Sequence, residues 1–397
     1  GEPPRLETYF FAGELSLTGA VVAVAGSLAL ACGVHKQCPQ QTLVLPCVSA
    51  QLASHVPNLK VIGVQSLFEA AQFFCGYVDL EPVHKQPLVV QSSPQFCMSE
   101  VMGQQQACLA LEIAAAGGHS MLLCGPPGVG TSMLAKRLPS LLPNLQLQQQ
   151  LGVAVLQQME EQAGQAFHLP LAPPFRAPHH SCSVAAMVGG GRIIRPGEIS
   201  LAHHGVLFMD EFPEFERRVL ESLREPLERG EIFIARANQR ARFPAQFQLI
   251  AAMNPCPCGY LGHAKRACRC TLDQITKYRN KLSGPLLDRI DLHVTLHFEP
   301  SDSLTQEVKE SSALIRQRVE RTRTIQQQRQ GCLNAQLSTQ QLSQHVLLEA
   351  SAQQLLVRAQ RKWSWSLRVV HRIQRVSRTL ADLEQSDVVT ESHVALA

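Results

Sequence analysis

This sequence lacks a strong charge imbalance and has few aromatic residues. Of its 397 residues, two are Trp and four are Tyr, while 45% are hydrophobic. The formal net charge is only +4, and this basic excess is too small to establish a nucleic-acid partner by itself. The composition excludes a fibrous protein and predicts a soluble globular chain with room for two or three domains.

Long hydrophobic runs are scarce as well. The stretch from Leu17 to Val34 is uncharged and about long enough to span a bilayer, but its Gly, Ala and Ser residues supply little transfer energy. A buried strand, turn and helix is therefore favoured over a membrane helix, and we expect no membrane association.

No secretory leader precedes the thirteen cysteines, which are scattered except for four between Cys256 and Cys270. An odd number of cysteines without a leader predicts a protein of the reducing cytoplasm. The first residue is Gly rather than Met, and a patterned segment follows at once. We therefore expect the true beginning of the protein to lie outside this sequence.

Three regions differ in their pattern, and we expect them to form separate domains, namely residues 1–85, 86–300 and 301–397. The first alternates short β-branched runs with Ala-rich helical stretches. The second contains apolar strands that are each followed by a turn or helix, which predicts a parallel sheet with ligands at the carboxyl ends of its strands. The third has helical patterning with many Gln and Arg, and Gln runs are typical of solvated helix faces.

A lysine is missing from the Gly-rich segment "GPPGVGTS". The segment follows the apolar run "HSMLLC" and precedes a helix-forming run, which is the context of a phosphate-binding loop. Thr131 stands where such a loop has its lysine. Backbone N–H groups can bind an anion here without the lysine, although a tight strand-to-helix turn is the alternative. The candidate nucleotide-binding residues are Gly125, Pro126, Pro127, Gly128, Val129, Gly130, Thr131 and Ser132.

Polar residues also end two other apolar strands. Asp210 and Glu211 follow "GVLFM", and Asn254 follows "LIAAM". Phosphoryl transfer needs one carboxylate to hold Mg²⁺ and another to orient the attacking water, which suits Asp210 and Glu211 respectively. Ser132 is the candidate hydroxyl ligand of Mg²⁺, and the amide of Asn254 could position the same water. A helix cap at Asp210 is the alternative.

Four cysteines form a C-x-C…C-x-C pattern around a polar loop. Four thiolates so close together suit the tetrahedral preference of zinc, and the loop has too few apolar residues to fold without such support. Free thiols or a redox disulfide are the alternatives, and His263 is a possible substitute ligand. The candidate zinc ligands are Cys256, Cys258, Cys268 and Cys270.

Two basic segments are candidates for contact with nucleic acid. One is expected at a hairpin tip and contains Arg236, Arg240 and Arg242, and the other is Gly-rich and contains Arg192 and Arg195. Such loops would contact phosphates without reading sequence. Near the C-terminus, four further arginines share a helix face that is expected to be solvated or to face another subunit. They are Arg368, Arg372, Arg375 and Arg378.

Several motifs together resemble the magnesium-chelatase-like AAA+ proteins of the ComM/YifB family. They include "FRAPHHSCSVAAMVGGG", "RPGEISLAHHGVLFMDEFPEF", "AAMNPCPCGYLG", "YRNKLSGPLLDRIDLHV" and "RVSRTLADL". The resemblance implies an α/β fold with an AAA+ parallel-sheet core, a partial Lon-protease-like N-terminal domain and a C-terminal helical lid. Leu28 stands where Lon proteases keep a catalytic lysine, so peptidase activity is not expected.

The resemblance also implies roles for individual residues. Asp210 and Glu211 match the Walker B acids, and Asn254 matches the sensor 1 residue. Arg289 matches the arginine finger, which acts on the nucleotide of a neighbouring subunit, although a salt bridge with a nearby aspartate, Asp288 or Asp291, is the alternative. Arg368 matches the sensor 2 arginine.

The function implied by this family is that of an ATP-driven, Mg²⁺-dependent homo-hexameric motor. It would act on single-stranded or branched DNA and promote branch migration during natural transformation. Because Thr131 replaces the lysine, we expect impaired hydrolysis. A non-hydrolysing ring component and a chelatase-type motor subunit that remodels a protein partner are the alternatives.

Overall fold

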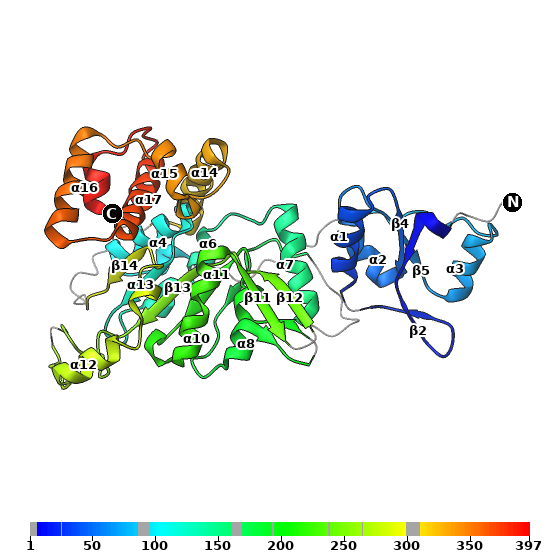
Figure 1. The fold of residues 1–397 in the computed structure, drawn as a ribbon, viewed down its shortest axis with the longest axis horizontal. Helices are drawn as coiled ribbons and strands as arrows, with labels where there is room; N and C mark the ends of the chain where they lie inside the picture. Colours follow the sequence, from blue (N-terminus) through cyan, green and yellow to red (C-terminus); the bar gives the residue numbers. More distant parts are fainter. Residues whose placement is uncertain are drawn as a thin grey trace. The chain divides into compact units, whose positions relative to one another are not determined.

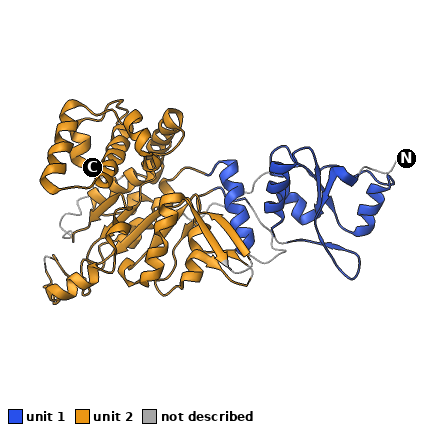
Figure 2. Ribbon diagram, viewed as in Figure 1, with its two compact units in different colours: residues 1–92, 145–171 blue, residues 93–144, 172–397 orange. Residues whose placement is uncertain are grey.

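The computed structural model describes residues 6–24, 26–85, 96–160, 169–192, 194–236, 239–263, 265–298 and 310–397. The chain forms two compact units (Figure 2). Unit 1 comprises residues 1–92 and 145–171, and unit 2 comprises residues 93–144 and 172–397. The second region expected from the sequence, residues 86–300, is therefore divided between the two units.

Unit 1 is built on a three-stranded parallel sheet in the order β1-β4-β5. These strands are β1 (Tyr9–Phe11), β4 (Thr42–Pro46) and β5 (Lys60–Val64). A short antiparallel pair consists of β2 (Glu14–Leu15) and β3 (Val21–Val22). The helices between the strands are α1 (Ser27–Gln37) and α2 (Cys47–Ala53), and α3 (Leu67–Phe74) follows β5. Figure 1 shows this arrangement in blue.

Helix α7 (Leu147–Glu160) belongs to unit 1 although it is distant in sequence. Its Leu151 and Ala154 are buried in the same core as Leu28 of α1. The side chain of Gln158 also accepts a hydrogen bond from the backbone N–H of Leu28 at 3.1 Å. The Gln-rich start of this helix is not only a solvated face, because Gln150 is buried and donates to the carbonyl oxygen of Leu145 at 2.8 Å.

The uncharged stretch from Leu17 to Val34 forms strand β3, a turn and most of α1. Gly26 caps the helix in the left-handed conformation, with φ of 76°. None of the helices in the described ranges combines the length and the apolar character needed to cross a membrane. Leu28, the residue at the expected Lon lysine position, is fully buried.

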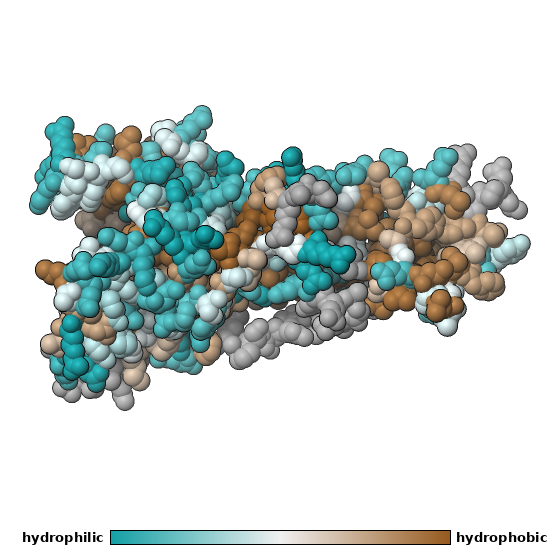
Figure 3. All heavy atoms as spheres, turned by 60° about the horizontal axis from the view of Figure 1, so that its bottom comes forward, coloured by the Kyte–Doolittle hydropathy of each residue, from teal (hydrophilic) through white to brown (hydrophobic). Residues whose placement is uncertain are grey.

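The surface of unit 1 carries many apolar side chains, seen as brown areas in Figure 3. Exposed apolar side chains near β1, β2 and α3 include Phe10, Phe11, Leu15, Leu17 and Phe68. Tyr9, Phe11 and Phe74 pack edge to face or tilted, with ring centroids 4.8–6.4 Å apart. Such contacts order the rings without removing them from water.

Unit 2 contains a five-stranded parallel sheet in the order β14-β6-β13-β10-β7. The strands are β6 (Met121–Cys124), β7 (Phe175–Arg176), β10 (Val206–Met209), β13 (Gln248–Met253) and β14 (Leu292–Thr295). Strands β6, β10 and β13 correspond to the three apolar runs that precede the candidate site residues. The predicted parallel sheet is confirmed, and it brings the carboxyl ends of these strands to one edge.

Short helices and two hairpins surround this sheet (Figure 1). The helices are α4 (Gln105–Gly117), α5 (Thr131–Ala135), α6 (Leu138–Leu141), α8 (Val184–Val188), α9 (Glu198–Leu201), α10 (Arg217–Ser222), α11 (Arg224–Arg229), α12 (Leu272–Arg279) and α13 (Gly284–Leu287). One hairpin pairs β8 (Gly189–Gly190) with β9 (Arg195–Pro196), and the other pairs β11 (Glu231–Arg236) with β12 (Gln239–Pro244). Within the described ranges, 3-10 turns occur at Leu6–Thr8, Met98–Glu100, Phe212–Glu214 and Asn334–Gln336.

The C-terminal part of unit 2 is helical, as the sequence predicted. Its helices are α14 (Ser312–Gln330), α15 (Thr339–His345), α16 (Ala350–Trp363), α17 (Leu367–Leu383) and α18 (Glu391–Leu396). The expectation of a solvated or subunit-facing arginine stripe on α17 is wrong for three of its members. Arg372 and Arg375 donate to backbone carbonyl oxygens of the same chain, and Arg378 is buried. Burial of a guanidinium requires such partners, which sequence spacing does not reveal.

A buried polar network joins the sheet to these helices. His119, which precedes β6, contacts Asp291 through Nδ1 at 3.0 Å and Thr379 of α17 through Nε2 at 2.8 Å. Asn334 donates to Thr379 at 3.0 Å and to Asp382 at 2.8 Å. The connected side chains come from both sides of the junction between sheet and helices, so this junction is held by specific geometry as well as by apolar burial.

We predict that Asp382→Asn strongly destabilises unit 2. The carboxylate of Asp382 is 1% exposed and pairs with Arg378, 2% exposed, and with Arg329. Loss of its charge leaves a buried guanidinium uncompensated, which costs about 3–5 kcal/mol. Urea unfolding followed by circular dichroism measures this cost. The control is Asp273→Asn, whose exposed pair with Lys277 should contribute little. Equal unfolding midpoints for the two variants would contradict the proposed importance of the network.

Candidate functional site

The Gly-rich segment forms a loop between β6 and α5, as expected for a phosphate loop. Gly128 and Gly130 adopt φ of 86° and 95°, a region that residues with a side chain seldom enter. At Gly125, an added Cβ would lie 2.8 Å from Val129 Cγ2 and 3.0 Å from Leu296 Cβ. The backbone N–H of Gly125 donates to the carbonyl oxygen of Met253 at 3.1 Å, which ties the loop to β13.

The hydroxyl and the first carboxylate of the candidate site are in direct contact. Ser132 Oγ donates to Asp210 Oδ2 at 2.6 Å, joining the start of α5 to the end of β10. The other oxygen of Asp210 accepts from the backbone N–H of Glu211 at 3.0 Å. A hydroxyl and a carboxylate oxygen at this spacing are oxygen ligands of the kind that Mg²⁺ prefers.

The second carboxylate has a partner that the sequence did not indicate. Glu211 adopts φ of 52° and its Oε2 lies 2.9 Å from Nδ1 of His180. His180 follows β7, the edge strand next to β10. The "HH" pair after that short strand is the only feature of the sequence that could have drawn attention to His180. The contact joins residues that are 31 positions apart (211 − 180), and no local pattern predicts it. A positive φ at a non-glycine residue is energetically costly and is common at functional sites.

Asn254 directly follows β13 at the same edge of the sheet. The Tyr278 phenol is buried, and its pKa is raised mainly by this burial and in part by the charge of Glu214. The segment after Asn254 contains the four-cysteine loop. The structure therefore joins Ser132 and Asp210 by a direct side-chain contact, with Glu211 next in the chain, and it places Asn254 at the same sheet edge through the pairing of β13 with β6.

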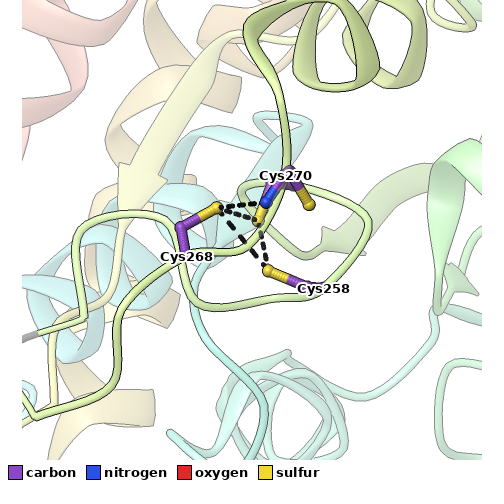
Figure 4. Close-up of side chains that lie close together, drawn as sticks. Cys258, Cys268 and Cys270 are labelled. Atoms are coloured by element: carbon purple, nitrogen blue, oxygen red, sulfur yellow. Dashed lines mark hydrogen bonds between the residues drawn. The ribbon is translucent and has the colours of Figure 1, made fainter.

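The four cysteines expected to bind zinc converge on one point. All four Sγ atoms lie within 4.8 Å of one another. Cys256 lies 3.4 Å from Cys258 and 3.6 Å from Cys268, and Cys258 lies 3.6 Å from Cys268. Figure 4 shows Cys258, Cys268 and Cys270 approaching from the two sides of the loop. These separations exceed an S–S bond of about 2.05 Å, so the four side chains are free thiols.

Backbone groups favour the thiolate form of Cys258, whereas burial and the neighbouring thiols raise the pKa of Cys268 and Cys270. N–H groups of Tyr260 and Arg269 lower the pKa of the Cys258 thiol to about 6. Donation to the charged form is what depresses a thiol pKa and prepares it for a metal. His263 lies outside the group, since its Nδ1 accepts from the backbone N–H groups of Lys265 and Arg266 at 3.0 and 3.1 Å.

The cysteine loop also packs directly against the phosphate loop. Gly259, with φ of 83°, faces Pro127 so closely that an added Cβ would lie 2.7 Å from Pro127 Cδ. The same Cβ would lie 3.8 Å from Cγ of Asn254. A glycine is therefore required both by the backbone conformation and by the close approach. The position of one side of the phosphate loop depends on the shape of the cysteine loop.

The arginines that match the arginine finger and sensor 2, Arg289 and Arg368, lie near a common carboxylate. Arg289 donates to the carbonyl oxygen of Pro285 at 2.6 Å and pairs with Glu228, so its partner is neither of the neighbouring aspartates. Hydrogen bonding and the charge of Arg289 lower the pKa of Glu228, and Arg368 adds a smaller effect. Arg368 is exposed in the first turn of α17. The structure does not bring either arginine into contact with the phosphate loop of its own chain.

The basic segments form the two hairpins of unit 2. Arg236 is the last residue of β11 and pairs with Gln239, while Arg240 and Arg242 are on β12. Arg242 forms an ion pair with Glu231, so part of its charge is compensated. In the Gly-rich segment the side chains of Arg192 and Arg195 are exposed.

The basic residues nearest in sequence after Thr131 do not replace the missing lysine. Arg137 is 6% exposed, and its guanidinium donates to the carbonyl oxygens of Cys97 and Met133 and to Glu100 at 2.5–3.0 Å. Lys136 is exposed beyond the first turn of α5. A side chain committed to three partners cannot also reach a bound phosphate without leaving them unsatisfied.

Two family descriptions account for most of unit 2. Residues 97–304 match "Magnesium chelatase, subunit ChlI", and residues 309–397 match "Magnesium chelatase, subunit ChlI C-terminal". The chain belongs to this family. Its mixed α/β fold, with the five-stranded parallel sheet and the helical C-terminal region, is that of a magnesium-chelatase-like AAA+ protein. This family implies ATP and Mg²⁺ as cofactors, whereas the Lon-like origin of unit 1 stays a prediction.

Individual relatives extend the similarity over the whole chain. Competence protein ComM of Haemophilus influenzae is 42% identical over 403 residues, which cover 99% of this chain and 77% of the relative. Uncharacterized protein YifB of Escherichia coli is 40% identical over 98% of this chain and 76% of its own length. DNA replication licensing factor Mcm6 of Drosophila melanogaster is 27% identical over 213 residues, 51% of this chain and 25% of its own length. The predicted membership in the ComM/YifB family is confirmed.

We predict that Gly259→Ala weakens binding of Mg²⁺-ATP. The added methyl group would press on Pro127, and about 1 kcal/mol of overpacking strain corresponds to a roughly fivefold higher dissociation constant. Gly262→Ala is the matched control, because Gly262 has a similar φ of 79° but an added Cβ would meet no atom of the described residues within 4 Å. Calorimetric titration with a non-hydrolysable nucleotide compares the two variants. Equal affinities would show that the contact with Pro127 does not position the loop.

Proposed function

We propose that this chain is the subunit of an ATP-dependent AAA+ ring that acts on single-stranded or branched DNA. The observation that carries the proposal is the meeting of Ser132, Asp210 and Glu211 beside a Gly-rich loop at one edge of a parallel sheet. The name of the Haemophilus relative supports a role in competence. Branch migration during natural transformation is the role implied by resemblance to that family, and the free cysteines favour a reducing cytoplasm.

Within this proposal, each residue of the site has a separate task. Ser132 Oγ and Asp210 Oδ2 would hold Mg²⁺, which when bound neutralises charge on the phosphates. Glu211 orients the attacking water, and His180 holds the carboxylate of Glu211 at 2.9 Å. The amide of Asn254 positions the same water. Backbone N–H groups of the loop bind the phosphate oxygens.

Assembly completes the site in the proposed ring. Arg289 does not contact the phosphate loop of its own chain, and action on the nucleotide of a neighbouring subunit would require its guanidinium to leave Glu228 and Pro285. A guanidinium supplied by a neighbour makes hydrolysis depend on assembly. Arg368 would sense the nucleotide from the helical region. The exposed Arg192 and Arg240, with Arg236 and Arg242 of the same hairpin, would contact DNA phosphates.

A second candidate function follows from Thr131. A hydrogen bond to a charged group is worth about 1.5–3 kcal/mol, so loss of the lysine weakens binding only moderately. Hydrolysis loses more, because one missing preorganised donor costs on the order of 100- to 1000-fold. Thr131 therefore favours a ring component that binds nucleotide but hydrolyses it poorly.

We also propose that the four cysteines bind one structural zinc ion. A tetrahedral site with Zn–S distances of about 2.3 Å separates its sulfur atoms by about 3.8 Å. The three short Sγ separations of 3.4–3.6 Å are close to this value. Cys256 is fully buried, and binding of zinc would deprotonate all four thiols. The ion would fix the shape of the cysteine loop and so hold Gly259 against Pro127.

We predict that Thr131→Lys raises ATP hydrolysis by about 100-fold or more, since it restores a cation against the phosphates. Thr131→Met is the control, because it adds a similar length without charge. Phosphate release is measured with Mg²⁺-ATP for all three proteins. If the unaltered chain hydrolyses ATP as fast as Thr131→Lys, another group supplies the charge and the proposed impairment is wrong.

The same assay separates a DNA motor from a chelatase-type motor that remodels a protein. For a DNA motor, hydrolysis by Thr131→Lys should increase with the length of added single-stranded DNA. Hydrolysis that does not respond to DNA would contradict the proposed substrate.

We predict about one zinc ion per purified chain. Metal analysis of freshly reduced protein measures it, and Cys268→Ser should release the ion because it removes one of four ligands. Cys75→Ser is the control, since Cys75 is an exposed thiol in unit 1. Freshly reduced protein without zinc would rule out the site.

A further inference from the structure

The chain has only two tryptophans, and the structure stacks them on an exposed turn of the helical region. Trp363 ends α16 and Trp365 lies two residues later, before α17 begins. Their ring centroids are 5.0 Å apart with an interplanar angle of 25°. Trp363 is 56% exposed and Trp365 is half-buried. A pair of large rings left in contact with water on a protein surface is unusual and marks an interaction site.

The turn is held in this shape by its backbone. Ser364 between the two rings adopts φ of 51°, in the left-handed region. The backbone N–H of Trp365 donates to the carbonyl oxygen of Gln360 at 3.2 Å. Ser366 then caps α17 by accepting from the backbone N–H of Val369 at 3.4 Å. The rings are thus presented by a fixed turn between two helices, and little entropy is lost when a ligand stacks on them.

The surroundings of the pair are positively charged. The sequence has no Asp or Glu from Ala350 to Ala381. Three arginines of this stretch lie on α17 and bind groups of the same chain. Arg372 and Arg375 donate to backbone carbonyl oxygens, and Arg378 pairs with Asp382. The side chains of Arg358, Arg361 and Lys362 are exposed, and Lys362 Nζ lies 5.1 Å from the centroid of the Trp363 ring. Within the described residues, Arg358 alone of these three pairs with a carboxylate, that of Glu391 at 3.9 Å.

We propose that the surface formed by Arg361, Lys362, Trp363 and Trp365 binds single-stranded nucleic acid. Indole rings stack on unpaired bases of any sequence, while the cations bind the phosphates that join them. A duplex would not expose its base faces to the rings, and a lone nucleotide would not need several separated cations. The proposal rests on the proposed DNA-binding function and adds a base-stacking site to the phosphate contacts of the two hairpins, and its test does not require nucleotide hydrolysis.

Intrinsic fluorescence tests the proposal directly, because all tryptophan emission of this chain arises from the proposed site. We expect saturable quenching by a thymidine oligodeoxynucleotide of about 15 residues, a length that spans one typical binding site. Quenching by the matching uridine oligoribonucleotide instead would assign the surface to RNA. Quenching by ATP alone, or a change of emission with protein concentration alone, would assign the pair to the nucleotide site or a subunit contact and overturn the proposal.

Variants separate stacking from charge. By anisotropy of a labelled oligonucleotide, Trp363→Leu/Trp365→Leu should bind about tenfold more weakly, whereas Trp363→Phe/Trp365→Phe should recover part of the affinity. Tyr77→Leu, which removes an exposed ring from unit 1, is the control. Arg361→Gln/Lys362→Gln should reduce the slope of log affinity against log salt by roughly 0.7 for each phosphate that the variant no longer neutralises.

The outcomes also distinguish this proposal from the proposed function. If the labelled oligonucleotide binds without quenching tryptophan and with unchanged affinity in the Leu variant, DNA binds elsewhere, and only the stacking site is wrong. If no oligonucleotide binds to the protein under any condition, the proposed DNA partner fails together with the stacking site.

Discussion

The parallel pairing of β6 with β13 is the constraint on which the candidate site depends. Cys124 lies opposite Met253 at the ends of the two strands, and the next N–H, that of Gly125, bonds back to Met253. This extension of the ladder starts the phosphate loop beside Asn254. Because β10 pairs with β13 on its other side, its acidic end reaches the same edge. The site results from strand register, and the loop needs no lysine to adopt its shape.

The strands of the parallel sheet and the Gly-rich loop could be predicted from the sequence, because the apolar pattern and the placement of glycines determine them. The buried runs before Gly125, Asp210 and Asn254 became neighbouring parallel strands, as expected. The contact of His180 with Glu211 could not be predicted, because it depends on β7 lying beside β10. The place of α7 in unit 1 could not be predicted either. Periodicity indicates that a helix buries one face, but it does not identify the surface that covers this face.

Several arginines of this protein donate hydrogen bonds to backbone carbonyl oxygens of the same chain. Arg137, Arg323 and Arg375 donate to the carbonyl oxygens of Cys97, Ala115 and Leu337 respectively. Their charges stabilise the fold from within and add little to the surface potential. The modest net charge is therefore a poor measure of local affinity for anions. The acid-free stretch around Trp363 differs because its outer cations remain in solvent.

The polar junction between the sheet and the C-terminal helices has a mechanical consequence. His119 and Thr379 are joined within the interior, and Arg372 of α17 donates to the carbonyl oxygen of Ile290 just before β14. Swinging α17 away from the sheet would break these bonds in a medium where water cannot replace them. The sheet and the C-terminal helices should therefore move together as one rigid body. Displacement of the sheet on ligand binding should carry the C-terminal helices with it.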